Sequence, residues 1–197
     1  MTEIAPSSPE PRRLIPSPIA LASLEFQQLL DWPFSQEYFY TRQVERMLRQ
    51  GLPHLIQYED CALWGYFDSE LNRELVGFGS LMLSSGYARY TEQRPHFYLP
   101  LLSTKPGIRS FGYGQFIVEH LVNEAAVAFS RMEENSWSDR IFLDVYTANE
   151  KACRLYTEKC GFETLNPDTP IPDPAENSEP YFVMARSLRI ATTENAG

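Results

Sequence analysis

The fold is decided by one stretch near the middle of the chain, LSTKPGIRSFGYG at positions 102–114. Pro106 and Gly107 interrupt the β-forming residues that come before them, and an amphipathic segment follows. Its apolar residues recur at every fourth position: Ile117, Leu121, Ala125 and Phe129. That spacing places them on one face of a helix of about four turns. The stretch therefore predicts a strand, a turn and a long helix in succession.

Gly112 and Gly114 fall at the expected first turn of this helix. The backbone N–H groups there have no helical partner, and the positive end of the helix dipole favours an anion such as a pyrophosphate. Glycine suits this position because a Cβ would keep a phosphate away from the amides. Most Gly-x-Gly pairs are plain turns, and this one lacks both the Lys-Ser/Thr of a P-loop and the third glycine of a Rossmann turn. Alone, it indicates an anion site without naming the ligand.

Helices and strands are predicted on both sides of this turn. Before it, we expect helices at 20–30 and 35–49 and strands at 61–67, 75–83 and 96–104. After it, we expect a buried strand at 140–147, a helix at 149–159 closed by Gly161, and strands at 162–166 and 181–186. This order predicts one mixed α/β domain, at residues 19–190.

Three segments have a composition unlike that of a packed core. Residues 1–18 carry five prolines, which predicts a mobile arm. We expect residues 191–197 to be a disordered tail. The acidic, proline-rich segment at 167–180 predicts a long surface loop.

Composition and charge disfavour several classes of protein. A net charge of -9 disfavours binding to nucleic acid, because that affinity comes largely from basic side chains. No apolar run approaches the roughly 18 residues of a membrane span, and no secretory signal is evident at the start. Cys61, Cys153 and Cys160 lack the spacing of a zinc site. We therefore expect a cytoplasmic protein with reduced thiols, no metal and no membrane partner.

Two motifs resemble those of a known family. The stretch at 102–114 resembles the acetyl-CoA signature of the GNAT N-acetyltransferase superfamily, in which a strand and a Pro precede Arg/Gln-x-x-Gly-x-Gly/Ala. The chain departs from it at Thr104, usually Val, and at Ser110-Phe111, where many members carry a basic residue. The segment Leu143–Tyr156, followed by Gly161-Phe162, resembles the second motif of that family. The resemblance covers roughly residues 75–186.

This resemblance implies a fold and an activity. The GNAT fold has a central mixed, mostly antiparallel sheet of about six to seven strands, flanked by about four helices and splayed between its two central strands. The implied reaction moves an acetyl group from acetyl-CoA to a primary amine of a small molecule, peptide or protein, by direct attack in a ternary complex. The net negative charge favours a cationic acceptor. We expect a monomer or homodimer. The alternative is a catalytically silent acyl-CoA sensor or interaction domain of the same fold.

The resemblance also assigns residues to the cofactor. Those implied to bind acetyl-CoA are Leu102, Ser103, Thr104, Arg109, Ser110, Phe111, Gly112, Tyr113, Gly114, Asn149 and Ala152. Capping of the second helix explains Asn149 equally well, and the two roles are compatible because a cap leaves the amide nitrogen free.

Acetyl transfer needs a base for the amine and an acid for the departing thiolate. Tyr156 matches the acid tyrosine of the family, although it also fits a packed aromatic side chain. Asp144 is charged within an apolar strand, and burial would raise its pKa enough for it to act as a base near neutrality. Pairing with an arginine, or capping of a loop, would explain Asp144 equally well.

A second candidate for the base, His96, lies on the strand before the glycine turn. His96 and Tyr98, both candidate catalytic residues, share one face of that strand with Pro100, and some small-amine acetyltransferases of the family carry bases on this strand. Pro100 would remove a hydrogen bond from the sheet, which fits the splay that the resemblance implies.

Overall fold

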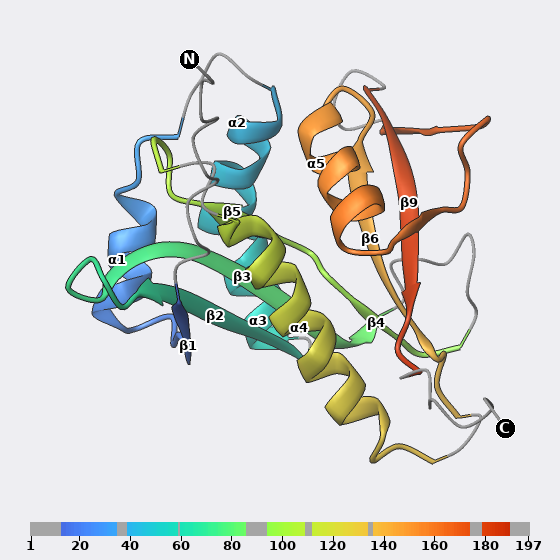
Figure 1. Ribbon diagram of the computed structural model, residues 1–197, viewed down its shortest axis with the longest axis horizontal. Coiled ribbons are helices and arrows are strands. Elements are labelled where there is room, and N and C mark those ends of the chain that lie inside the picture. Colours follow the sequence, from blue (N-terminus) through green and yellow to red (C-terminus); the bar gives the residue numbers. More distant parts are fainter. Residues whose placement is uncertain are drawn as a thin grey trace, which may run out of the picture.

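One sheet organises the computed structural model, which describes residues 13–34, 39–58, 60–85, 94–108, 112–133, 136–173 and 179–189. Among these residues the sheet has nine strands: β1 (Leu14–Pro18), β2 (Cys61–Asp68), β3 (Glu74–Ser85), β4 (His96–Tyr98), β5 (Leu102–Thr104), β6 (Arg140–Tyr146), β7 (Glu163–Thr164), β8 (Ile171–Asp173) and β9 (Glu179–Ser187). Their order is β1-β2-β3-β4-β6-β9-β7, with β5 beside β3 and β8 beside β9 (Figure 1).

The pairing is antiparallel everywhere except between β4 and β6, which are parallel at Phe97↔Ile141 and Tyr98↔Phe142. The mixed, mostly antiparallel sheet of the expected fold is thus confirmed. It has more strands than expected because two short edge strands, β1 and β8, join it and one expected strand divides into β4 and β5.

The helical segments form four units in the described residues. They are α1 (Leu24–Leu30), a continuous run of α2 (Phe39–Arg46), π-helical turn η1 (Met47–Gly51) and α3 (Leu52–Tyr58), then α4 (Tyr113–Phe129), and α5 (Glu150–Arg154) running into π-helical turn η2 (Leu155–Lys159). None of the described helices is long and apolar enough to cross a membrane.

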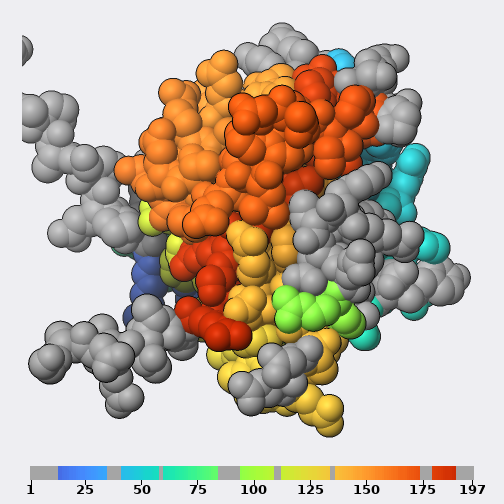
Figure 2. Space-filling view, turned by 90° about the vertical axis from the view of Figure 1, so that its right-hand side faces the viewer, coloured from blue at the N-terminus to red at the C-terminus, as the bar shows by residue number. Residues whose placement is uncertain are grey.

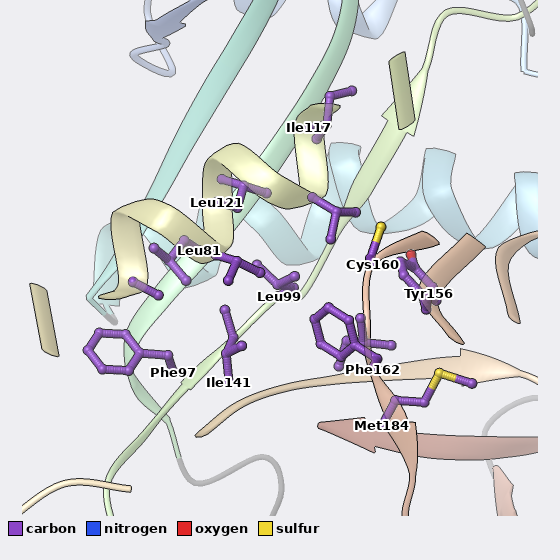
Figure 3. Packing of buried hydrophobic residues seen from close by; sticks show 14 of the residues in the cluster. Leu81, Phe97, Leu99, Ile117, Leu121, Ile141, Tyr156, Cys160, Phe162 and Met184 are labelled. Atoms are coloured by element: carbon purple, nitrogen blue, oxygen red, sulfur yellow. The ribbon is translucent and has the colours of Figure 1, made fainter. Parts of the chain in front are cut away.

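Strand β3 separates two layers of helices because its side chains alternate between faces. Gly77 and Gly79 face α4, where an added Cβ would lie 2.5 Å from Ile117 and 2.7 Å from Leu121. Small residues on this face therefore let the long helix lie close to the sheet. Figure 3 shows Ile117 and Leu121 above the sheet residues that complete this buried cluster. Phe78 belongs instead to a second cluster, with Phe26 and Leu29 of α1 and Leu48 and Leu52 of the α2–α3 run.

The arm expected at 1–18 was wrong at its C-terminal end. Leu14–Pro18 forms β1, which pairs with β2 in the register Leu14↔Asp68, and Leu14 is buried. The prolines misled the prediction, since an edge strand tolerates residues without an N–H on its unpaired side. Residues 1–12 and the expected tail at 191–197 lie outside the described residues.

Other expected boundaries also moved. The strand at 96–104 is interrupted at Leu99–Leu101, and the helix expected to end at 49 continues through η1 to Tyr58. The segment at 167–180 contains β8, which pairs with β9, so this part is an edge strand rather than loop. Gly161 has the left-handed φ of 65° expected where the second helix ends.

Candidate active site

A cavity opens where the middle of the sheet divides. Tyr98 of β4 still pairs with β6, and the next residue, Leu99, donates from its N–H to the Phe142 carbonyl at 2.9 Å. The Leu101 carbonyl turns the other way and accepts from the Ser80 N–H of β3 at 2.8 Å. The strands diverge across Pro100, as its missing N–H predicted. The resulting cavity of about 420 Å³ falls in the size range of small-molecule sites.

Asp144 of β6 and Tyr98 of β4 face this cavity together. The Tyr98 hydroxyl donates to Oδ2 of Asp144 at 2.8 Å. The Asp144 side chain is open to solvent through the cavity, but the protein around it limits its hydration. This desolvation raises its pKa to about 6, against the opposing effect of the Tyr98 hydrogen bond. Asp144 is therefore mostly ionised at neutral pH, with a pKa suited to exchanging a proton there.

Tyr156 lies on η2 and lines the same cavity. Its side chain is 8% exposed, and its ring packs against Phe162 with the centroids 5.9 Å apart (Figure 3). Within the described residues its hydroxyl has no hydrogen-bond partner. Burial raises the pKa of the phenol, so the proton stays on the oxygen at neutral pH. Tyr156 thus brings an available proton donor into the cavity.

The sequence did not single out two further residues of the cavity wall. The Tyr146 hydroxyl of β6 donates to Oδ2 of Asp173 at 2.8 Å, and both line the cavity. Asp173 belongs to β8, so the acidic segment at 167–180 contributes a carboxylate to the site. The opposite wall carries Arg46 and Met47 from the α2–η1 run. The composition of the segment at 167–180 showed that it is acidic, but only the pairing of β8 with β9 brings Asp173 to the cavity wall.

His96 is placed differently from Asp144. It is fully buried, its Nδ1 donates to the Arg94 carbonyl at 3.0 Å, and its ring meets the edge of Phe142 with the centroids 5.0 Å apart. It is not among the residues that line the cavity. The structure thus brings Tyr98, but not His96, to Asp144.

The described part of the glycine turn has the backbone expected of an anion site. Gly112 precedes α4 with a left-handed φ of 75°, which favours glycine. The Phe116 N–H bonds the Gly112 carbonyl at 3.1 Å, so the amides of Tyr113, Gly114 and Gln115 precede this first helical hydrogen bond. Arg109, Ser110 and Phe111 lie outside the described residues.

The other expected cofactor residues divide into two groups. Leu102, Asn149 and Ala152 line the cavity, and Asn149 caps α5 by accepting from the Ala152 N–H at 3.3 Å. Ser103 and Thr104 pair with Phe78 and Gly77 of β3 and are not among its described lining residues. The Tyr113 side chain is buried and turns into the protein, which leaves its amide at the turn. A Cβ on Gly114 would lie 3.2 Å from Leu155, so this glycine also lets α4 approach η2.

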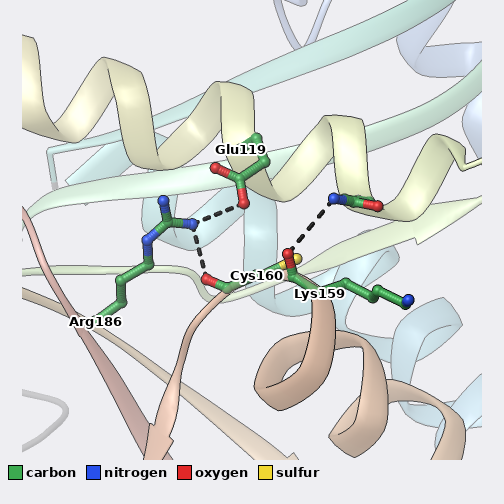
Figure 4. A network of polar contacts seen from close by, with 5 residues as sticks. Glu119, Lys159, Cys160 and Arg186 are labelled. Atoms are coloured by element: carbon green, nitrogen blue, oxygen red, sulfur yellow. Dashed lines mark hydrogen bonds and ion pairs between the residues drawn. The ribbon is translucent and has the colours of Figure 1, made fainter.

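A second cavity, of about 700 Å³, lies between α4 and the end of β9. Its charged side chains pair with one another. Arg186 pairs with Glu119 at 2.8 Å (Figure 4). Arg189 pairs with Asp139 at 2.7 Å, and Arg140 pairs with Glu163 at 3.5 Å. Figure 2 shows the β9 side of the molecule, with the orange segment around β8 above the red end of β9. Apart from Gly161, no described residue of either motif lines this cavity, so the motif residues favour the smaller one as the candidate site.

The sequence model of the Acetyltransferase (GNAT) family matches residues 25–162, most of the chain. The chain belongs to the GNAT acetyltransferase family. The match covers both the glycine turn and the second motif, so the resemblance seen in the sequence is confirmed. No curated protein matches the chain.

Solved structures of this family share the fold. A chimera of the Vibrio cholerae spermidine N-acetyltransferase SpeG with hSSAT aligns with a TM-score of 0.60 and 14% identity, covering 89% of this chain and 95% of the other. The spermidine N-acetyltransferase from Vibrio cholerae in complex with CoA and spermine aligns with a TM-score of 0.55 and 16% identity, over 89% and 95% of the two chains. A dodecameric form of the same enzyme gives 0.56 and 15%, over 89% and 94%. At these identities the likeness establishes the GNAT fold alone.

Proposed function

We propose that this GNAT protein is an N-acetyltransferase that moves an acetyl group from acetyl-CoA to a cationic primary amine by direct attack in a ternary complex. The observation that carries the proposal is the cavity itself. A carboxylate with a pKa near neutrality, Asp144, and a buried phenol, Tyr156, both line it where the central strands diverge.

The residues at the start of α4 and along the cavity suit acetyl-CoA as the acyl donor. The amides of residues 113–115 at the start of α4 suit a pyrophosphate, and the opening between β5 and β6 suits the pantetheine arm. Asn149 and Ala152 lie farther along the same cavity wall. Bound acetyl-CoA would supply the activated thioester.

Asp144 is the proposed base. A free alkylamine has a pKa near 10, but its nitrogen becomes far more acidic once it bonds to the acyl carbon. A carboxylate oxygen with a pKa of about 6 can then accept the proton. Tyr98 holds that carboxylate from the neighbouring strand, which fixes the direction of proton transfer.

Tyr156 is the proposed acid. The sulfur that departs from the thioester carries negative charge and needs a hydrogen-bond donor or a proton. The Tyr156 hydroxyl retains its proton because burial raises its pKa. No partner among the described residues competes for that proton.

The acceptor is proposed to carry positive charge beyond the reacting nitrogen. Asp144 and Asp173 place two carboxylates in the cavity, and the hydrogen bond from Tyr146 orients the second one. The net charge of -9 favours the approach of a cation. The polyamines named for the Vibrio cholerae enzyme have this chemistry, which supports the choice of a cationic acceptor.

Release of free thiol from acetyl-CoA tests the proposal. The purified protein would be given a monoamine with no charge beyond the reacting nitrogen, a series of diamines, spermidine and a peptide with a free N-terminus. We expect amine-dependent thiol release, fastest with an acceptor that carries positive charge beyond the reacting nitrogen. Binding of acetyl-CoA without release on any amine would contradict the proposal and favour the acyl-CoA sensor.

A further inference from the structure

The turn between β2 and β3 contacts both ends of the segment 105–113, which belongs to the acetyl-CoA signature at 102–114 and is called the donor motif below. This turn spans residues 68–74, and Asn72 and Arg73 adopt left-handed φ values of 50° and 61° within it. One end of the turn contacts Tyr113, at the start of α4, and the other contacts Lys105, just after β5. The donor motif is thus flanked by two contacts to a single hairpin.

Asp68 makes the first contact. It is fully buried, and its Oδ1 accepts from the N–H groups of Glu70 at 2.8 Å and Leu71 at 3.3 Å, which fixes the carboxylate in its own turn. Its Oδ2 accepts from the Tyr113 hydroxyl. Because Tyr113 is the first residue of α4, this bond ties the first turn of the helix to the hairpin.

Glu74 makes the second contact, through an ion pair with the Lys105 ammonium. The Lys105 N–H also donates to the Val76 carbonyl of β3 at 2.8 Å, so both main chain and side chain hold this residue. The two contacts fix the end of β5 and the start of α4 relative to each other. Their relative position determines where the amides at the start of α4 lie with respect to the opening between β5 and β6.

We propose that Asp68 and Glu74 are positioning residues for the pyrophosphate of the acyl donor, acting through Tyr113 and Lys105. Neither needs to touch the donor. They set the orientation of amides whose attraction for a phosphate depends on direction and distance. This inference rests on the proposed function, since it concerns the same donor site.

The test compares two donors that differ in the pyrophosphate. S-acetylpantetheine carries the thioester and the pantetheine arm but lacks the pyrophosphate and the nucleotide. The wild-type protein and the Tyr113→Phe and Glu74→Gln variants would be assayed with both donors and one amine. We expect kcat/KM to fall about tenfold for acetyl-CoA in Tyr113→Phe, less in the more exposed Glu74→Gln, and little for S-acetylpantetheine in either. Dissociation constants for CoA should rise in parallel.

Glu119→Gln provides the matched control. It removes an ion pair from the same helix, with Arg186, away from the donor turn (Figure 4). We expect it to change thermal stability without changing the preference for acetyl-CoA over S-acetylpantetheine. An unchanged preference in Tyr113→Phe and Glu74→Gln, with CoA bound as in the wild type, would overturn the positioning role and leave the proposed function standing. Failure of the wild-type protein to bind CoA would overturn both.

Discussion

Tyr98 and Asp144 join the two strands that separate to form the active site. Their 2.8 Å hydrogen bond runs from Tyr98, the last β4 residue that pairs with β6, to Asp144, which lies two residues beyond the Tyr98 partner Phe142. The hydroxyl donates to the ionised carboxylate, so the bond favours the charged form and opposes the effect of desolvation on the pKa. The same contact therefore orients the proposed base and keeps its pKa below the value that desolvation alone would give.

The Tyr98→Phe variant should move the acid limb of the pH–rate profile. Removal of the hydroxyl withdraws a stabilising donor from the Asp144 carboxylate, so its pKa rises above about 6. We expect the rise of kcat/KM with pH to shift upward by about 0.5 to 1 pH unit. Tyr146→Phe is the matched control, because its hydroxyl contacts Asp173 instead. A shift of equal size in both variants would show that Tyr98 has no specific effect on the base.

The Asp144→Asn variant should be more stable than the wild type at neutral pH. The pKa of Asp144 is raised on folding, so its ionisation disfavours the folded state above about pH 6, and this effect disappears as the pH falls below 3.8. Solvent in the cavity screens the carboxylate, so we expect a gain of about 1 kcal/mol, or roughly 2–4 °C in Tm, at pH 7.5. Thermal unfolding at pH 7.5 and pH 4 measures it. A gain of the same size at both pH values would contradict the assignment.

The Tyr156→Phe variant should lower turnover while leaving acetyl-CoA affinity nearly unchanged. The ring stays packed against Phe162, and only a hydroxyl without a partner among the described residues is lost. We expect kcat to fall about 10- to 100-fold. Steady-state kinetics together with CoA titration separate the two effects. Wild-type turnover in this variant would remove Tyr156 as the proton donor.

The Asp173→Asn variant should change acceptor use and spare the donor. Asp173 reaches the cavity from β8, away from the amides at the start of α4. We expect KM for a diamine to rise about tenfold, KM for a monoamine without a second charge to change little, and KM for acetyl-CoA to stay the same. Glu179→Gln is the control, since it lies opposite Asp173 in the β8–β9 pair and is not among the residues that line the cavity. An equal rise of KM for the diamine and the monoamine would show that Asp173 does not recognise charge.

The parts of the fold governed by local chemistry were predictable from the sequence. The spacing of Ile117 and Leu121 set the core face of α4, Gly161 ended the second helix, and Asn149 capped its start. The desolvation of Asp144 also followed from its place in an apolar strand. Each of these features depends on residues close together in the chain, so a pattern of a few residues contains it.

The parts governed by distant pairing were not predictable. The prolines of β1 resemble those of a loop until β2 pairs with one side of the strand. Asp173 reaches the site only because β8 pairs with β9, and nothing in its own segment indicates that. His96 and Tyr98 look equivalent on one strand, yet the divergence at Pro100 leaves only Tyr98 beside the cavity. The π-helical turn that carries Tyr156 has no evident sequence signal either.

The pH dependence of kcat/KM for acetylation of a diamine, in the wild type and in Asp144→Asn, tests the central claim most directly. Because an alkylamine has a pKa near 10, kcat/KM is expressed per concentration of unprotonated amine. In the wild type we expect this quantity to rise with pH through an apparent pKa near 6, where the carboxylate becomes ionised. In Asp144→Asn, that limb should disappear and the plateau should fall by about 100-fold. An unchanged acid limb and plateau in this variant would contradict the account, because the proton would then be accepted by a group other than Asp144.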